Sequence, residues 1–177
     1  MLDSLSNIFK ITELRNKILY TLMMFAVFRA GIHIPVPGVD ASVIESLFTS
    51  GNLFGLLDLF AGGALSKFSI FAMSITPYIN ASIIMQLLQS VVPQFEAWSK
   101  DGEDGRKKIA KVTRYGTVVL GFVQAAGMAF ALRANNALVN NDFLSVFVVA
   151  IILTAGTCLL MWIGEQITAY GLSLIHI

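Results

Sequence analysis

Charge is the scarcest property of this sequence. Only 13% of its 177 residues are Asp, Glu, Lys or Arg, about half the share expected in a soluble domain, whereas 56% are hydrophobic. The single cysteine, Cys158, has no partner for a disulfide and therefore gives no information on redox compartment. A net charge of +1 provides no overall attraction to nucleic acid.

Motifs for catalysis and metal binding are also missing. The chain holds no P-loop, no GxSxG, no HExxH, no CxxC and no GxGxxG. Its two histidines are His33 and His176, and no cluster of metal-ligating residues surrounds them. Asp58 and Ser66 lie in the same region as His33, but their spacing does not indicate a nucleophilic site. We therefore expect no enzyme, no cofactor and no metal, and a function based on shape and binding.

A long apolar run without charge is what the sequence has instead. Residues 68–95 contain no charged side chain, and a run of this length is typical of a membrane span. A basic segment follows directly at 96–115, and Lys and Arg concentrate on the cytoplasmic side of membranes. Because the run also holds Ser, Thr, Asn and Gln, we expect it to face protein or water rather than lipid.

Hydropathy predicts an all-α membrane protein with four spans. The N-terminus and the segment between spans 2 and 3 hold most of the Lys and Arg, while the other two connections hold only Lys67 and Arg133. The positive-inside rule therefore places the N-terminus in the cytoplasm. The predicted order is a cytoplasmic N-terminus (1–17), span 1 (18–34), an extracytoplasmic segment (35–67), span 2 (68–92), a basic cytoplasmic loop (93–114), span 3 (115–132), an extracytoplasmic loop (133–142), span 4 (143–164) and a cytoplasmic end (165–177).

Two segments have further local signals. Residues 53–60 are almost wholly apolar but too short to cross a bilayer, so they are interfacial, re-entrant or buried in protein. In span 3, Gly121, Ala125 and Ala129 form a face of small residues that predicts close helix contact.

Span 2 carries a stripe of mixed character. At 100° per residue, a sector of about 60° collects Ile75, Ile79, Ser82 and Gln86. One interpretation is a water-filled cytoplasmic vestibule that leads to an apolar constriction, which blocks ions by dewetting. The other is ordinary helix packing, with isoleucine in the core and the polar groups bonded to neighbouring helices. The helical wheel alone favours packing.

Four motifs, in order and with consistent spacing over about residues 10–170, resemble the SecY family, whose members form the pore of the general protein-export channel. They are Phe28–Val39, Gly62–Leu88, Gly102–Val118 and Trp162–Thr168. The resemblance implies about four of the ten transmembrane helices of a pseudo-symmetric channel, together with a short re-entrant plug helix. Such a channel moves unfolded secretory polypeptides across the bacterial plasma (inner) membrane and releases membrane spans sideways into lipid.

The resemblance also implies roles for individual residues and partners. It makes Ile75 and Ile79 part of an apolar pore ring, in place of the packing interpretation. The plug would contain Phe54, Leu56, Leu57, Phe60, Gly62, Gly63, Leu65 and Phe68; the lateral gate would contain Ser82, Gln86 and Leu87; and the cytoplasmic basic loop would contain Arg106, Lys107, Lys108 and Lys111. Implied partners are the small subunits SecE and SecG, the SecA motor ATPase, the ribosome, signal sequences and membrane lipid, without direct reading of nucleic acid.

The sequence leaves the family pattern near its end. After Gly164 and the EQIT motif, the family continues into a polar loop and a fifth span, whereas this chain runs from Ala169 to Ile177. We expect either the N-terminal portion of a longer protein or a final segment that is not native. Rival interpretations are half of an inverted-repeat transporter, a structural subunit without a pore, and an intramembrane enzyme.

Overall fold

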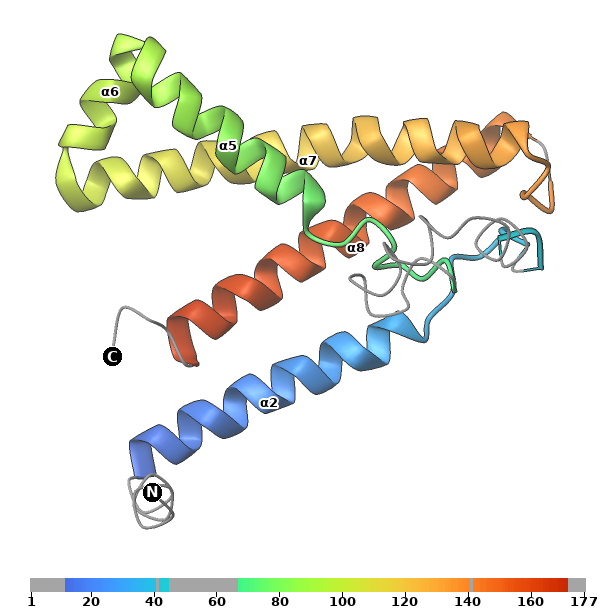
Figure 1. Cartoon of the computed structure of the whole chain (residues 1–177), viewed down its shortest axis with the longest axis horizontal. Coiled ribbons are helices and arrows are strands. Elements are labelled where there is room, and N and C mark those ends of the chain that lie inside the picture. The colour runs from blue at the N-terminus through green and yellow to red at the C-terminus, as the bar shows by residue number, and fades with distance from the viewer. Residues whose placement is uncertain (1–11, 41, 45–66, 141, 172–177) are drawn as a thin grey trace, which may run out of the picture.

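Helices make up about four fifths of the described residues. The computed structural model describes residues 12–40, 42–44, 67–140 and 142–171, drawn as coloured ribbon in Figure 1. Within these residues there is no strand, only isolated bridges between Pro35 and Ser69 and between Val39 and Leu138. The helices are α2 (Thr12–Ile32), α5 (Thr76–Val91), α6 (Pro93–Lys100), α7 (Gly102–Ala134) and α8 (Phe143–Tyr170).

Two of these helices are long and apolar enough to cross a membrane. They are α7, with 33 residues, and α8, with 28, which correspond to about 50 and 42 Å of helix. Helix α2 carries Arg15, Lys17 and Arg29 within its 21 residues, and α5 has only 16 residues. The all-α class is therefore confirmed for the described residues, while the count of four spans stays a prediction.

The structure departs from the predicted second span at its start. We expected a span over 68–92, but helix α5 begins at Thr76 and residues 68–75 form a coil. Phe68 and Ser74 have φ values of 40° and 53°, and such left-handed conformations do not occur within a right-handed helix. Pro77 lies in the first turn of α5, where its missing N–H costs nothing. The proline therefore starts this helix and does not kink it.

The segment expected as a basic loop, 93–114, is almost entirely helical. Helix α6 occupies its first part, and the opening turns of α7 occupy the rest. The two helices meet closely because Gly105 has no side chain; a Cβ there would lie 1.7 Å from the carbonyl oxygen of Trp98. Phe95 packs edge-on against the Trp98 ring, at 5.3 Å between centroids. This contact joins residues three apart on α6 and therefore stabilises that helix.

Small residues form the contact between α7 and α8. Gly121, Ala125 and Ala129 are all buried, as the small-residue face predicted, and α8 meets this region with Val149 and Leu153. Four threonines are also buried in the two helices, and each hydroxyl donates to the carbonyl four residues earlier, so the interior holds no unbonded hydroxyl from them. They are Thr113, Thr117, Thr154 and Thr157.

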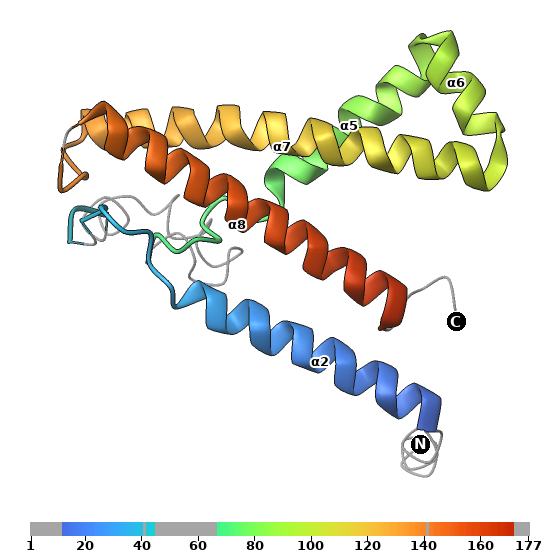
Figure 2. The same ribbon diagram turned by 180° about the vertical axis from the view of Figure 1, so that it is seen from behind.

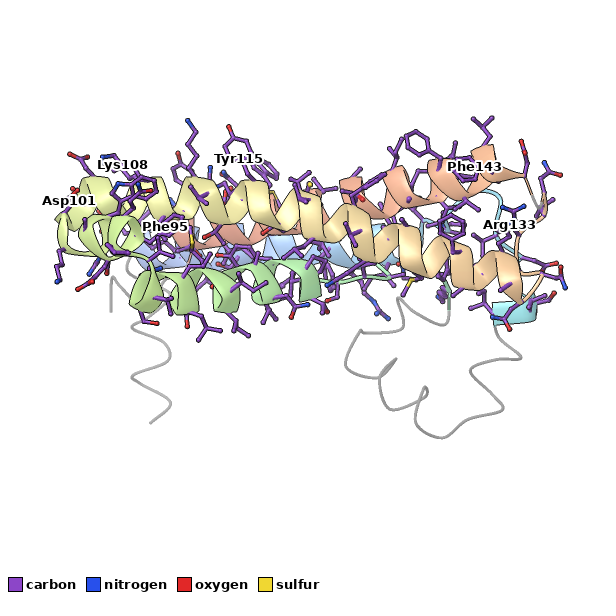
Figure 3. The ribbon with its side chains drawn as sticks, turned by 90° about the horizontal axis from the view of Figure 1, so that it is seen from above. Phe95, Asp101, Lys108, Tyr115, Arg133 and Phe143 are labelled. Atoms are coloured by element: carbon purple, nitrogen blue, oxygen red, sulfur yellow. The ribbon has the colours of Figure 1, made fainter. Side chains whose placement is uncertain are left out.

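The helices are arranged so that one end of the molecule collects the basic residues. Figures 1 and 2 show α2 beside α8, with the start of α2, the end of α8 and the α6–α7 turn all at one end. In Figure 3, Asp101 and Lys108 lie at that end, and Arg133 and Phe143 lie at the other. The α2–α8 contact includes a hydrogen bond of 3.3 Å from the Tyr20 hydroxyl to Gln166. The positive-inside pattern and the fold thus agree on which helix ends lie together.

Candidate functional site

Helix α5 is held along one face. Its buried residues are Pro77, Ala81 and Met85, spaced four apart and hence on one side of the helix. Glycines of α7 lie opposite this face: a Cβ on Gly121 would be 3.6 Å from Pro77, and one on Gly116 would be 3.9 Å from Ala81. Both are ordinary contact distances, so α5 lies flat on α7.

The other side of α5 is uncovered within the described chain. Ile75, at the helix N-cap, is 45% exposed and Ile79 is 46% exposed. Ile83 and Leu87 continue this apolar side toward the end of the helix, at 49% and 62% exposed. The two isoleucines predicted for the pore ring are therefore not packed into the core of the described residues, and their place in a pore ring stays a prediction.

A polar groove lies between this uncovered side and the rest of the bundle. It has a volume of about 350 Å³ and combines amide and hydroxyl groups of α5 with one cation and one carboxylate, Arg106 and Glu165. Its lining residues are Tyr78, Ser82, Met85, Gln86, Gln89, Ser99, Arg106, Ile109, Ala110, Thr113 and Glu165. Groups of this kind hold water and can solvate a passing peptide backbone.

A second hollow continues the groove toward the isoleucines. It measures about 520 Å³ and shares Tyr78, Ala110 and Glu165 with the groove. Ile75 lies on its wall together with Leu160 and Met161 of α8. The wall of this second hollow thus combines apolar side chains with the charged Arg114 and Glu165.

An ion pair crosses between α7 and α8 beside both hollows. The Arg114 Nε donates to Glu165 Oε1 at 2.6 Å. The side chains are 53% and 33% exposed, so water screens the pair and its net stabilisation is about 1 kcal/mol or less. Sequence reasoning did not pair these residues, because no spacing signal links positions 51 apart.

The residues predicted for the lateral gate divide between two sides of α5. Ser82 and Gln86 line the polar groove, whereas Leu87 is on the uncovered side. The predicted plug residues lie outside the described residues, with one exception. Phe68 is 5% exposed and belongs to the hydrophobic core.

The four residues predicted as a basic loop lie on the opening turns of α7. Arg106, Lys107, Lys108 and Lys111 are all exposed. Arg106 lines the groove, and Lys108 lies over the Trp98 ring at 6.0 Å. Lys107 and Lys111 line a hollow of about 430 Å³ on the outer side of α7. The basic residues at the start of α7 therefore line both the groove and the second surface of this helix.

The carboxylate of Glu96, which lies outside the predicted spans, has a pKa that a neighbouring lysine lowers. Lys100 Nζ lies 2.6 Å from Glu96 Oε1 and lowers the pKa of Glu96 below its usual value, by hydrogen bonding first and by charge second. Because the pKa of Glu96 is lowered in the folded protein, its ion pair stabilises the fold at pH values above the unfolded-state pKa. This stabilisation is lost as the pH falls through the folded-state pKa.

In the described residues, no group of three His, Cys, Asp or Glu side chains could hold a metal ion.

A helical fold in the described residues, with two helices long and apolar enough to cross a membrane, indicates a membrane protein. The SecY family model matches residues 69–174. The protein translocase subunit SecY of Halalkalibacterium halodurans is 54% identical over 176 residues, that of Bacillus subtilis 52% over 175, and that of Staphylococcus aureus 48% over 177. Each alignment covers 97% of this chain. The chain belongs to the SecY family.

The chain spans only part of these relatives. It covers 40% of the length of the first two and 41% of the third. These relatives are therefore more than twice as long as this chain.

Proposed function

We propose that this chain supplies the N-terminal part of a protein-conducting membrane channel. The whole protein would move unfolded secretory polypeptides across the bacterial plasma membrane and release membrane spans sideways into lipid. Membership of the SecY family supports this proposal. The structural observation that carries it is α5, which is fixed to α7 by one face and leaves Ile75 and Ile79 uncovered beside a polar groove.

The two isoleucines would form part of an apolar constriction. Branched side chains repel water from a narrow passage and thereby block ions, yet they yield sideways when a polypeptide enters. The groove lined by Ser82 and Gln86 would be part of the wetted vestibule on the cytoplasmic side. A chain entering there would exchange water for amide and hydroxyl groups before it meets the constriction.

The exposed apolar side of α5 would be one wall of the lateral gate. Leu87 and Ile83 are exposed along it and could contact either lipid or an arriving signal sequence, because both are apolar. Residues 54–65 would supply the plug.

The partners of the whole protein would be SecE, SecG, SecA, the ribosome and signal sequences. The exposed basic row of Arg106, Lys107, Lys108 and Lys111 would contact a cytoplasmic partner. Such a contact fits its position at the end of the molecule where the basic residues collect (Figure 3).

The proposed topology predicts opposite labelling of two cysteines in the full-length protein. Asp104, with an 87% exposed side chain, would lie in the cytoplasm, and Asn135, exposed at the far end of α7, would lie outside. A membrane-impermeant thiol reagent added to intact cells should label N135C and spare D104C until the cells are opened. Labelling of D104C in intact cells would contradict the orientation.

The proposed function is tested by crosslinking to a polypeptide arrested during export. A photoreactive residue in place of Ile79 in the full-length protein should crosslink to the arrested chain. The matched control is Ile84, which is as exposed as Ile79, at 46%, but lies about 140° away around α5. Crosslinks from position 79 and few from position 84 are expected. Equal crosslinking, or none from 79, would favour a structural subunit without a pore.

A further inference from the structure

The coil that leads into α5 is among the most deeply buried parts of the described chain. Five of the six residues from 68 to 73 are no more than 7% exposed, and Ser69 is fully covered. In this they contrast with α5 itself, in which only three of the 16 residues are buried. The buried coil residues are Phe68, Ser69, Phe71, Ala72 and Met73.

Two glycines on different helices make room for this coil. A Cβ on Gly156 of α8 would lie 1.9 Å from the carbonyl oxygen of Ile70, and a Cβ on Gly31 of α2 would lie 2.1 Å from the ring of Phe71. The Phe71 ring also stacks on that of Phe28, at 5.7 Å between centroids. The distances of 1.9 and 2.1 Å from the added Cβ atoms are too short for a real side chain. The coil therefore lies where glycine, which has no Cβ, leaves space for it.

Backbone hydrogen bonds fix the same coil from a third direction. Val36 N–H donates to the Phe68 carbonyl at 3.0 Å, and Ile70 N–H donates to the Ile34 carbonyl at 3.1 Å. These bonds flank an antiparallel pair, Pro35 and Ser69, which is of the kind that is not itself hydrogen-bonded. The α-carbons of such pairs lie about 4.5 Å apart.

The contact of α5 with α7 is of a different kind. A Cβ atom on Gly121 or Gly116 of α7 would lie 3.6 or 3.9 Å from α5, an ordinary contact distance. Between coil and helix lies Ser74, whose φ of 53° places the change of direction at one residue. The chain is therefore deeply buried before Ser74, whereas after it α5 is held along one face only.

We propose that residues 68–73 are a fixed mount from which α5 moves, and that Gly31 and Gly156 are positioning residues for this mount. The proposal rests on the channel function proposed above. In it, α5 tilts about Ser74 and Ile75 when a polypeptide enters, while the coil stays seated on α2 and α8. Ile75 is then the part of α5 that moves least, and Leu87 the part that moves most.

A disulfide across the bridge tests whether the mount stays in place. Paired residues of this kind are within disulfide reach, since about 4.4–6.8 Å between α-carbons is required. The full-length channel carries Pro35→Cys and Ser69→Cys, with Cys158 and any other cysteines replaced, and is reconstituted with its motor and partner subunits. We expect the disulfide to form and the rate of precursor uptake to be the same before oxidation and after it.

Each other outcome has a defined meaning. A loss of uptake on oxidation that is reversed by reductant, and is absent from the two single-cysteine variants, would show that the coil must leave its seat and would overturn the inference. Failure of the disulfide to form would contradict the pairing itself. If the reduced variant and the wild type both fail to take up precursor, the proposed channel function falls, and the inference falls with it.

A glycine substitution tests the positioning residues separately. Gly156→Ala forces the Ile70 carbonyl to shift and should lower the yield of the Pro35–Ser69 disulfide and raise the resting ion conductance. The control is Gly127→Ala on α7, where an added Cβ meets nothing within 4 Å. Both changes replace glycine in a helix, so helix propensity acts alike on them. An unchanged disulfide yield in Gly156→Ala would overturn its role.

Discussion

Replacing Ile75 and Ile79 together by glycine is expected to make the resting full-length channel leak ions, and Ile79→Gly alone should leak less. Both side chains are almost half exposed on the uncovered side of α5, where the proposed constriction lies. Their removal widens and wets the constriction, since branched apolar groups no longer exclude water.

The expected size follows from the apolar groups removed. Each glycine substitution deletes the whole isoleucine side chain, and transfer of one CH₂ group out of water is worth about 0.8 kcal/mol. A fall of about 1.4 kcal/mol in the barrier corresponds to about tenfold in rate. We therefore expect the double variant to raise the resting current in planar bilayers by at least about tenfold.

A matched control separates the constriction from a general loosening of α5. Ile84→Gly removes the same side chain from the same helix at the same 46% exposure, about 180° from Ile75. Its cost in helix propensity equals that of Ile79→Gly. Resting current close to the wild type in Ile84→Gly, together with a leak in the double variant, is expected. A double variant that remains closed would return both isoleucines to structural packing.

The second large effect concerns residues 1–177 by themselves, which should insert into membranes but take up no secretory precursor. The chain covers 40% of its relatives, and a pore between two halves cannot be closed by one. Gln86 is exposed on α5, beside Leu87 and Val91 at 62% and 77%. Polar groups left to lipid without partners are costly, so the isolated piece should also aggregate.

The measurement is signal-sequence-dependent uptake into proteoliposomes that contain only residues 1–177, with motor and ATP supplied. The full-length protein in matched vesicles is the positive control, and a precursor without its signal sequence sets the background. Uptake at background for residues 1–177, restored when the C-terminal remainder is co-expressed, is the expected result. Efficient uptake by residues 1–177 alone would show that no second half is needed.

Periodicity and composition predicted the parts of the fold that depend on one helix face. The small-residue stripe at Gly121, Ala125 and Ala129 is buried, and Gly121 faces both Pro77 of α5 and Thr154 of α8, because period and residue size suffice to define such a face. Helix α8 begins at Phe143, as expected for span 4, and Asp142 caps it by accepting from the Phe143 N–H. These features are local in sequence, so a single sequence contains them.

Hydropathy could not locate the coil at 68–75. Its residues are as apolar as those of a span. The helix does not extend back into this segment because Phe68 and Ser74 have positive φ values. The same measure treated 93–114 as a loop because of its charge. Lys, Arg and Glu are good helix formers, and the close approach of Trp98 to Gly105 brings two helices together there.

The candidate site was predictable in part. The stripe of Ile75, Ile79, Ser82 and Gln86 follows from helical geometry, and the coil just before Thr76 leaves it intact because Ile75 still accepts from the Ile79 N–H at 3.1 Å. The Arg114–Glu165 pair required the three-dimensional contact of α7 with α8. The contacts of Gly31 with Phe71 and of Gly156 with Ile70 also required the three-dimensional structure. A glycine in a helix can indicate a close approach, but it does not indicate which residue approaches.

Blocking the leak with a polypeptide tests the central claim most directly, because it asks whether ions and exported chains share one path past Ile75 and Ile79. Single-channel current is recorded from the full-length Ile75→Gly, Ile79→Gly variant before and after a precursor is arrested in it. The account predicts that the open variant closes when the precursor is trapped and reopens when the precursor is released. A current that is unchanged while the precursor is shown to be bound would contradict it.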